Sequence, residues 1–277
     1  MGSNPTGPTT GHHHLSDQRS HFRPRAGPAR VGRLLLSHGG AGRIGPVDPP
    51  DHAAVGRGPA DAGQGRTAGP VGFDLDLTLI DSRAAIMAAW SAIIGETGVE
   101  IDLVAVEGRL GVKLEDEIPF WFSPDQVGAV AAAYRRHYVR LAPSLTTALP
   151  GAREALAAVR ELGETPVVIT AKHLVSVGPS MMAARLTVQE IFTHVHGQEK
   201  AAVLARIRAA VYVGDTPHDM IAARSAGVHA VGVSTGSFAR PELLAGGAHV
   251  VLSSLAEFPA WYAAFRRAPG PASPQGS

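Results

Sequence analysis

The sequence contains no cysteine. This absence excludes disulfides, thiolate catalysis and cysteine-ligated zinc, and it is typical of proteins kept in a reducing compartment. Long apolar runs are also absent, since no segment reaches the ~18 consecutive apolar residues that a membrane-spanning helix needs. The N-terminus lacks the charged start and apolar block of a signal peptide. We therefore expect a cytoplasmic protein without a membrane partner.

The chain has little excess charge and few aromatic residues. Its formal net charge is +1, with 18% charged and 5% aromatic residues. Proteins that bind nucleic acid usually carry a strong basic excess, so no nucleic-acid partner is expected. The length of 277 residues allows one sizeable core with a subsidiary domain.

Residues 1–69 are poor in core-forming side chains and rich in Gly, Pro, His, Ala and Arg, and their one apolar cluster is Leu34 to Leu36. Such a composition buries too little surface to offset the entropy of ordering the chain. The sequence predicts disorder here, and also in the Pro-, Gly- and Ser-rich residues 267–277. Alternatively, translation of the protein starts near residue 70, and the first segment is an artefact of the choice of start site.

Acidic residues crowd the end of the first apolar strand of the remaining chain. The strand Val71 to Phe73 is followed by Asp74, Asp76 and Thr78. Ligands of parallel α/β sheets bind outside the carboxyl ends of the strands. Two carboxylates this close raise each other's proton affinity unless a cation intervenes, and Mg²⁺ is commonly bound by one or two carboxylates together with phosphate oxygens. The sequence therefore predicts a Mg²⁺ site at this strand end.

The next part of the chain is expected to be helical. Apolar residues at helical spacing predict helices over 84–94, 103–110 and 125–141. We interpret residues 85–148 as a helical domain inserted into the sheet domain.

Strands and helices alternate after the insertion. Strands are expected at 166–170, 191–195, 211–213, 228–233 and 248–252, with helices at 152–162, 181–186, 198–208, 216–226, 241–245 and 255–266. This alternation is typical of an α/β fold with a doubly wound parallel sheet. The predicted sheet domain comprises residues 70–84 and 149–266.

Further polar residues follow the later strands. Thr170 ends one strand, and Asp215 follows another with Asp219 close behind it. Lys200 lies in the first turn of a helix, where the helix dipole disfavours a cation, so its placement points to a functional role. Lys172, two residues after Thr170, is the alternative candidate for the role of Lys200.

These four elements, in this order, resemble the motifs of the haloacid dehalogenase-like (HAD) hydrolase superfamily: DxDxT at Asp74, a hydroxyl at Thr170, a lysine at Lys200, and GDxxxD at Asp215. The resemblance covers about residues 71–262 and is strongest to phosphoglycolate-phosphatase-like members. One departure is that Ala201 stands where the family usually has proline.

The resemblance implies a HAD-type Rossmann-like sheet with a type-one helical cap, which closes over the active site. It implies that Asp74 is the nucleophile and Asp76 the general acid/base, and that Thr170 and Lys200 bind the phosphoryl group. Mg²⁺ would be held by Asp74, the backbone carbonyl of Asp76 and Asp215. Asp219 would support this site.

The expected function is that of a Mg²⁺-dependent phosphatase acting on a small phosphorylated metabolite through an aspartyl-phosphate, as a monomer or homodimer. Arg109 and Lys113 in the cap are candidate substrate contacts. The alternatives are a β-phosphoglucomutase-like phosphotransferase, which shares all four motifs, and a non-catalytic phosphoryl-binding module. A dehalogenase of the superfamily usually lacks the acid at Asp76, and a receiver domain lacks the helical insertion.

Overall fold

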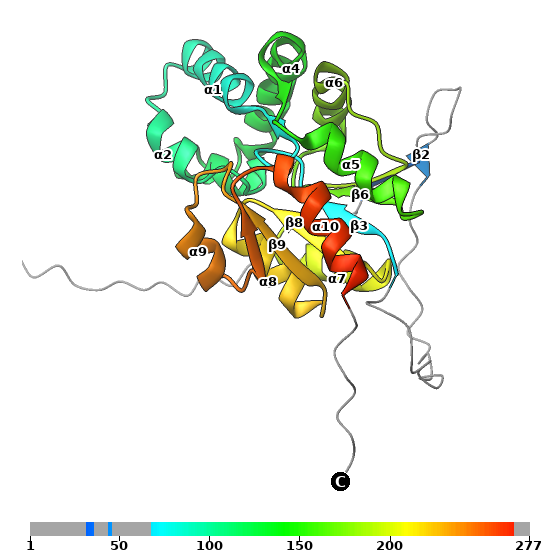
Figure 1. Cartoon of the computed structure of the whole chain (residues 1–277). Helices are drawn as coiled ribbons and strands as arrows, with labels where there is room; N and C mark the ends of the chain where they lie inside the picture. The colour runs from blue at the N-terminus through cyan, green and yellow to red at the C-terminus, as the bar shows by residue number, and fades with distance from the viewer. Residues whose placement is uncertain (1–31, 36–43, 46–67, 269–277) are drawn as a thin grey trace, which may run out of the picture.

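The structure, a computed structural model, describes residues 32–35, 44–45 and 68–268 (Figure 1). Its centre is a sheet with the strand order β10-β9-β8-β3-β6-β7-β1-β2. The first six strands in this order are parallel. They are β3 (Val71–Phe73), β6 (Pro166–Ile169), β7 (Glu190–Thr193), β8 (Val211–Gly214), β9 (His229–Val233) and β10 (Val250–Leu252).

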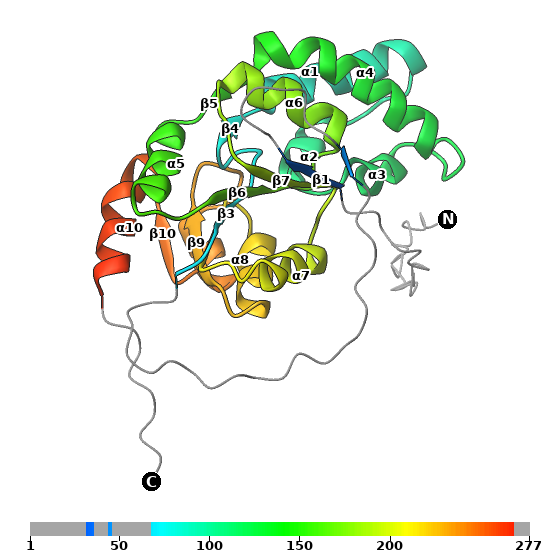
Figure 2. The ribbon, with the colours of Figure 1, turned by 90° about the vertical axis from the view of Figure 1, so that its right-hand side faces the viewer.

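Helices cover both faces of the sheet (Figure 2). One face packs against α5 (Ala152–Glu161), α6 (Leu174–Ala184) and α10 (Phe258–Arg267), and the other against α7 (Gln198–Arg206), α8 (Pro217–Ser225) and α9 (Arg240–Ala245). Successive strand residues point to opposite faces, so Val71 and Phe73 belong to the first layer and Tyr212 to the second. Gly72 is required between them, because a Cβ there would lie 2.8 Å from the Tyr212 ring.

A second group of helices lies over the carboxyl ends of the strands (Figure 1). The elements of this cap are α1 (Arg83–Thr97), α2 (Leu103–Gly108), α3 (Leu114–Glu117), η1 (Ile118–Phe120) and α4 (Val127–Leu145). The cap has its own apolar core, in which Trp90 and Tyr138 are fully buried. The chain enters and leaves it through β4 (Ile80–Asp81) and β5 (Thr147–Ala148), which pair antiparallel. The predicted doubly wound α/β sheet with an inserted helical cap is therefore confirmed, whereas the bounds 85–148 stay a prediction.

Two short strands lie within residues 1–69, the segment for which the sequence predicts disorder. Residues Gly32–Leu35 form β1, which pairs antiparallel with β7, and Ile44–Gly45 form β2 beside it. Without β1, the edge of β7 would expose unpaired backbone groups, which favours the addition of another strand. β1 overlaps the one apolar cluster of the segment. Residues 1–31, 36–43 and 46–67 lie outside the described residues, as do 269–277 of the predicted tail.

Two helices that contain proline extend beyond the predicted limits. α6 begins at Leu174 rather than near 181 and passes through Pro179, and α4 continues to Leu145 with Pro143 inside it. Proline disfavours a helix interior locally, but packing of α4 against both α1 and α6 outweighs that preference. Over the described ranges, no helix combines the length and apolar character needed to cross a bilayer.

Candidate active site

Three neighbouring strands deliver polar side chains to one edge of the sheet. Asp74 follows β3, Thr170 follows β6 and Asp215 follows β8, and β3 lies between the other two. Because all three strands are parallel, their carboxyl ends meet, and the three side chains are buried there. The structure thus brings together the acids and the hydroxyl that were predicted from separate parts of the sequence.

Lys200 is the lysine that contacts Asp74. It lies in the first turn of α7, and its Nζ donates to Asp74 Oδ1 and to Asp219 Oδ1, both at 2.7 Å. Burial alone would lower the pKa of Lys200, but Asp219 and Asp74 raise it well above its usual value. The ammonium charge is therefore firmly held beside the candidate nucleophile.

Asp219 orients this lysine from the start of α8. It is 1% exposed and closes the capping box of the helix, since its Oδ2 accepts from the Thr216 backbone and hydroxyl. Its Oδ1 also accepts from the Tyr212 hydroxyl at 3.2 Å. Burial would raise the pKa of Asp219, yet Lys200 and Thr216 hold it below its usual value. Both oxygens of Asp219 are thus engaged by protein donors.

Asp215 lies opposite Asp74. The Thr78 hydroxyl donates to its Oδ1 at 2.9 Å, so the third polar residue of the DxDxT segment links the two strand ends. The loop after β9 also comes close, because a Cβ at Gly236 would lie 1.9 Å from Asp215 Oδ2. Glycine at this position keeps room beside the carboxylate.

Negative charge exceeds positive charge at this buried edge. Asp74, Asp215 and Asp219 each offer a carboxylate oxygen within 4.8 Å of the others, and Lys200 is the cation bonded among them. Burial raises the pKa of Asp74 to about 7, with Asp219 and Asp76 adding to the rise and Lys200 opposing it. Burial, together with Asp74 and Asp219, also raises the pKa of Asp215 well above its usual value.

The donor set fits a hard divalent cation. Oxygen ligands are what Mg²⁺ prefers, and a doubly charged ion would compensate the excess carboxylate charge. Because Asp219 is saturated by protein donors, Asp74 and Asp215 are the carboxylates that remain for a metal. The side chain of Asp76 is not among these grouped acids, and its predicted contact through the backbone carbonyl stays a prediction.

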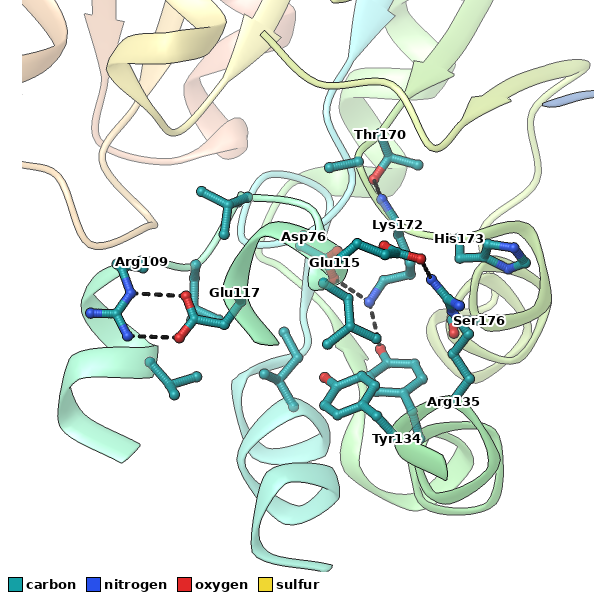
Figure 3. Close-up of a pocket in the computed structure, with 18 of the residues that line it drawn as sticks. Asp76, Arg109, Glu115, Glu117, Tyr134, Arg135, Thr170, Lys172, His173 and Ser176 are labelled. Atoms are coloured by element: carbon teal, nitrogen blue, oxygen red, sulfur yellow. Dashed lines mark hydrogen bonds and ion pairs between the residues drawn. The ribbon is translucent and has the colours of Figure 1, made fainter. Parts of the chain in front are cut away.

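Asp76 is held by a different set of partners. Its Oδ1 accepts from the Ser82 hydroxyl. The same oxygen lies 3.0 Å from Lys172 Nζ (Figure 3), and Lys172 also donates to the Tyr138 hydroxyl at 3.0 Å. Burial would lower the pKa of Lys172, but Asp76, Tyr138 and Tyr134 together raise it. The two lysines considered from the sequence therefore serve the two acids separately, which sequence reasoning missed.

The cap and the sheet edge enclose a pocket of about 100 Å³. Asp74, Asp76 and Thr170 line it from the sheet side, and α1, α3, α4 and residues 109–112 between α2 and α3 contribute most of the cap side. Arg109 lines the pocket as predicted for a substrate contact, although its guanidinium is bonded to Glu117. Lys113 is not among the lining residues and instead contacts Glu199 of α7 at 2.6 Å.

Buried carboxylates at the edge of a doubly wound sheet, beneath a helical cap, define the class as a capped α/β protein with an acidic site. Comparison with known proteins narrows the class. Residues 71–224 match the family model of haloacid dehalogenase-like hydrolases. This match covers more than half of the chain, so the protein belongs to that family, and the predicted superfamily and enzyme class are confirmed.

Individual relatives share about a quarter of their residues with this chain. The chain is 27% identical over 207 residues to a protein of Dickeya dadantii named "Probable phosphatase IndB", covering 67% of this chain and 89% of that protein. It is 27% identical over 191 residues to a protein of Agrobacterium fabrum named "Phosphoglycolate phosphatase", covering 59% of this chain and 79% of that protein. A crystal structure of a hydrolase from Pseudomonas syringae has the same fold, with a TM-score of 0.62, 22% identity, and coverage of 72% and 99%.

Proposed function

We propose that the protein is a Mg²⁺-dependent phosphatase that hydrolyses a small phosphorylated metabolite through an aspartyl-phosphate at Asp74. The observation that carries this proposal is the pairing of Asp74 with Lys200 beside Thr170 and Asp215 at the carboxyl edge of the sheet. The two curated relatives named as phosphatases support the same reaction class.

In the first step, a carboxylate oxygen of Asp74 attacks phosphorus and the bond from phosphorus to the leaving oxygen breaks. Asp76 gives a proton to that oxygen, so the product leaves as a neutral alcohol. Lys200 and the Thr170 hydroxyl bind the non-bridging oxygens, on which negative charge accumulates. Mg²⁺, held by Asp74 and Asp215, would neutralise charge on the same phosphoryl group.

In the second step, water attacks the phosphorus of the aspartyl-phosphate. Asp76, now a carboxylate, takes the proton from the water, and the bond from phosphorus to the Asp74 oxygen breaks to release inorganic phosphate. The hydrogen bond from Ser82 and the ion pair with Lys172 hold the Asp76 side chain in place at the pocket for this role.

Turnover of p-nitrophenyl phosphate tests the proposal. The protein should release phosphate in the presence of Mg²⁺ and lose that activity in excess EDTA, with recovery when Mg²⁺ is restored. Undiminished hydrolysis in EDTA would contradict the metal-dependent mechanism.

A β-phosphoglucomutase-like phosphotransferase remains the second candidate, because it would use the same four motifs. The fate of the aspartyl-phosphate separates the two functions. A phosphatase passes the phosphoryl group to water, so product analysis with labelled substrate should give inorganic phosphate rather than a second phosphorylated sugar.

A further inference from the structure

We propose that this enzyme selects phosphate monoesters whose leaving group is uncharged and partly apolar, and discriminates against leaving groups that carry a carboxylate or a second phosphate. The inference rests on the proposed phosphatase function and concerns the cap side of the same pocket. Its basis is that each arginine or lysine lining the pocket has an acidic partner of its own within the described residues.

Arg109 is committed to Glu117. Its Nε and Nη2 donate to the two oxygens of that carboxylate at 2.8 and 2.7 Å, which is the bidentate geometry that arginine forms best. The guanidinium also lies 4.4 Å from the centre of the Phe120 ring. Glu117 is only 4% exposed and accepts a further bond from the Trp121 indole. Turning Arg109 toward a substrate anion would leave this buried carboxylate uncompensated.

The other two cations that line the pocket also have acidic partners, although Arg135 Nε and Glu115 Oε2 make no hydrogen bond of their own. Arg135 of α4 is bonded to Glu115 of α3, and this contact holds the pKa of Glu115 below its usual value despite burial. Lys172 is paired with Asp76. Burial and the neighbouring Arg135 lower the pKa of His173, which favours its neutral ring. Figure 3 shows one arginine pair on each side of Lys172.

Both arginine pairs lie entirely within the cap. Arg109, Glu115, Glu117 and Arg135 all belong to the segment from α2 to α4, so movement of the cap relative to the sheet does not separate them. The neutralisation is thus a built-in property of the cap surface.

Apolar and aromatic side chains also line the pocket. Trp90 and Tyr134 pack with ring centres 5.2 Å apart, and Ile86, Val106 and Leu110 continue the same wall. Such a surface gains free energy by covering an apolar group and offers no compensation for an anion that loses its water. At the phosphate end of the pocket, Asp74 is bonded to Lys200, and this lysine together with a metal would compensate the charge of the phosphate.

Two matched pairs of substrates test the inference. Phenyl phosphate is compared with 4-carboxyphenyl phosphate, and ethyl phosphate with 2-phosphoglycolate, all in Mg²⁺. The carboxylate of 4-carboxyphenol makes it the better leaving group, so a preference for the phenyl ester reports the pocket and not the intrinsic chemistry. We expect kcat/KM to be about tenfold or more higher for the uncharged member of each pair. The carboxylate of the charged member would lose its water in the pocket without gaining a cation that is free to pair with it.

Removing one pocket carboxylate should relax the selectivity. Glu117→Gln leaves the charge of Arg109 uncompensated and should reduce the preference for phenyl over 4-carboxyphenyl phosphate by about threefold or more. Glu107→Gln is the matched control, since Glu107 lies in the cap but outside the pocket lining and should keep the wild-type ratio. Glu115→Gln provides a second test on the other pair if Glu117→Gln does not fold.

The outcomes separate this inference from the proposed function. Hydrolysis of all four esters with equal or higher kcat/KM for the charged members would overturn the inference and leave the phosphatase function standing. An unchanged ratio in folded Glu117→Gln and Glu115→Gln would also overturn it. Absence of phosphate release from every ester in Mg²⁺ would contradict the phosphatase function itself.

Discussion

At the scale of single residues, the two acids after β3 differ in their surroundings although their chemistry is the same. Asp74 is bonded to Lys200 beside Asp215, where a metal fits, whereas Asp76 faces Ser82 and Lys172 at the base of the pocket. The first position suits a nucleophile whose phosphoryl adduct would be surrounded by positive charge. The second suits a group that exchanges protons with the leaving oxygen and with water.

Substitution of these acids should therefore give different kinetic defects. Asp74→Asn removes the proposed nucleophile and should abolish any covalent intermediate. Asp76→Asn keeps the nucleophile but loses proton transfer, which is typically worth about a hundred- to ten-thousand-fold, so hydrolysis of the phosphoenzyme should stall. Rapid quench with labelled p-nitrophenyl phosphate should detect labelled protein only in the second variant. Label on Asp74→Asn together with none on Asp76→Asn would reverse the two assignments.

At the scale of elements, an ion pair joins the cap to the sheet domain next to the candidate active site. Lys113, which precedes α3, donates to Glu199 in the first turn of α7, and Lys200 is the following residue. The cap also approaches α8, because a Cβ at Gly111 would lie 3.2 Å from the Thr216 side chain. We interpret this contact as one that favours the closed position of the cap and not as a substrate contact.

A double-mutant cycle on this pair tests that interpretation. Lys113→Met should lower kcat/KM by about two- to tenfold, because one interaction that favours closure is lost. Glu199→Gln should have a similar effect while keeping its bond to the His196 backbone, and the double variant should be little worse than either single variant.

The pair His137 and Glu96 is the control, since both residues lie within the cap at 2.7 Å from each other. The same cycle on this pair should leave kcat/KM close to the wild-type value. Fully additive losses at Lys113 and Glu199 would show that the two side chains act independently and would contradict a shared role in closure.

At the scale of the whole molecule, the sequence predicted what depends on local patterns. The alternation of apolar strands and amphipathic segments predicted the sheet and the approximate extent of most helices. Asp74, Thr170 and Asp215 at the strand ends predicted the edge of the sheet where the candidate site lies. It did not predict β1 and β2, because pairing at an open sheet edge depends on β7, which is more than a hundred residues away. The neutralisation of Arg109 by Glu117 was also missed, since it depends on how α2, α3 and η1 fold against each other.

The stability of the whole protein should also report the metal site. Without a metal, Asp74 keeps a proton up to a pKa of about 7, whereas an unfolded aspartate loses it near 3.8. The native state therefore binds more protons than the unfolded state between these values, so stability falls as pH rises through this window. Asp215 acts in the same direction. A bound Mg²⁺ stabilises the ionised carboxylates and should remove this loss.

The increase in Tm caused by saturating Mg²⁺ relative to EDTA should thus grow from about pH 5 to about pH 7 and then level off. Thermal unfolding at a series of pH values measures it directly. Asp215→Asn is the control, because it removes one of the two carboxylates left for the metal while preserving side-chain volume, and it should show little increase at any pH. Taking the difference between the two proteins cancels the titration of histidines elsewhere in the chain. A Mg²⁺-dependent increase that is independent of pH, or equal in Asp215→Asn, would mean that the cation binds away from the Asp74 and Asp215 carboxylates.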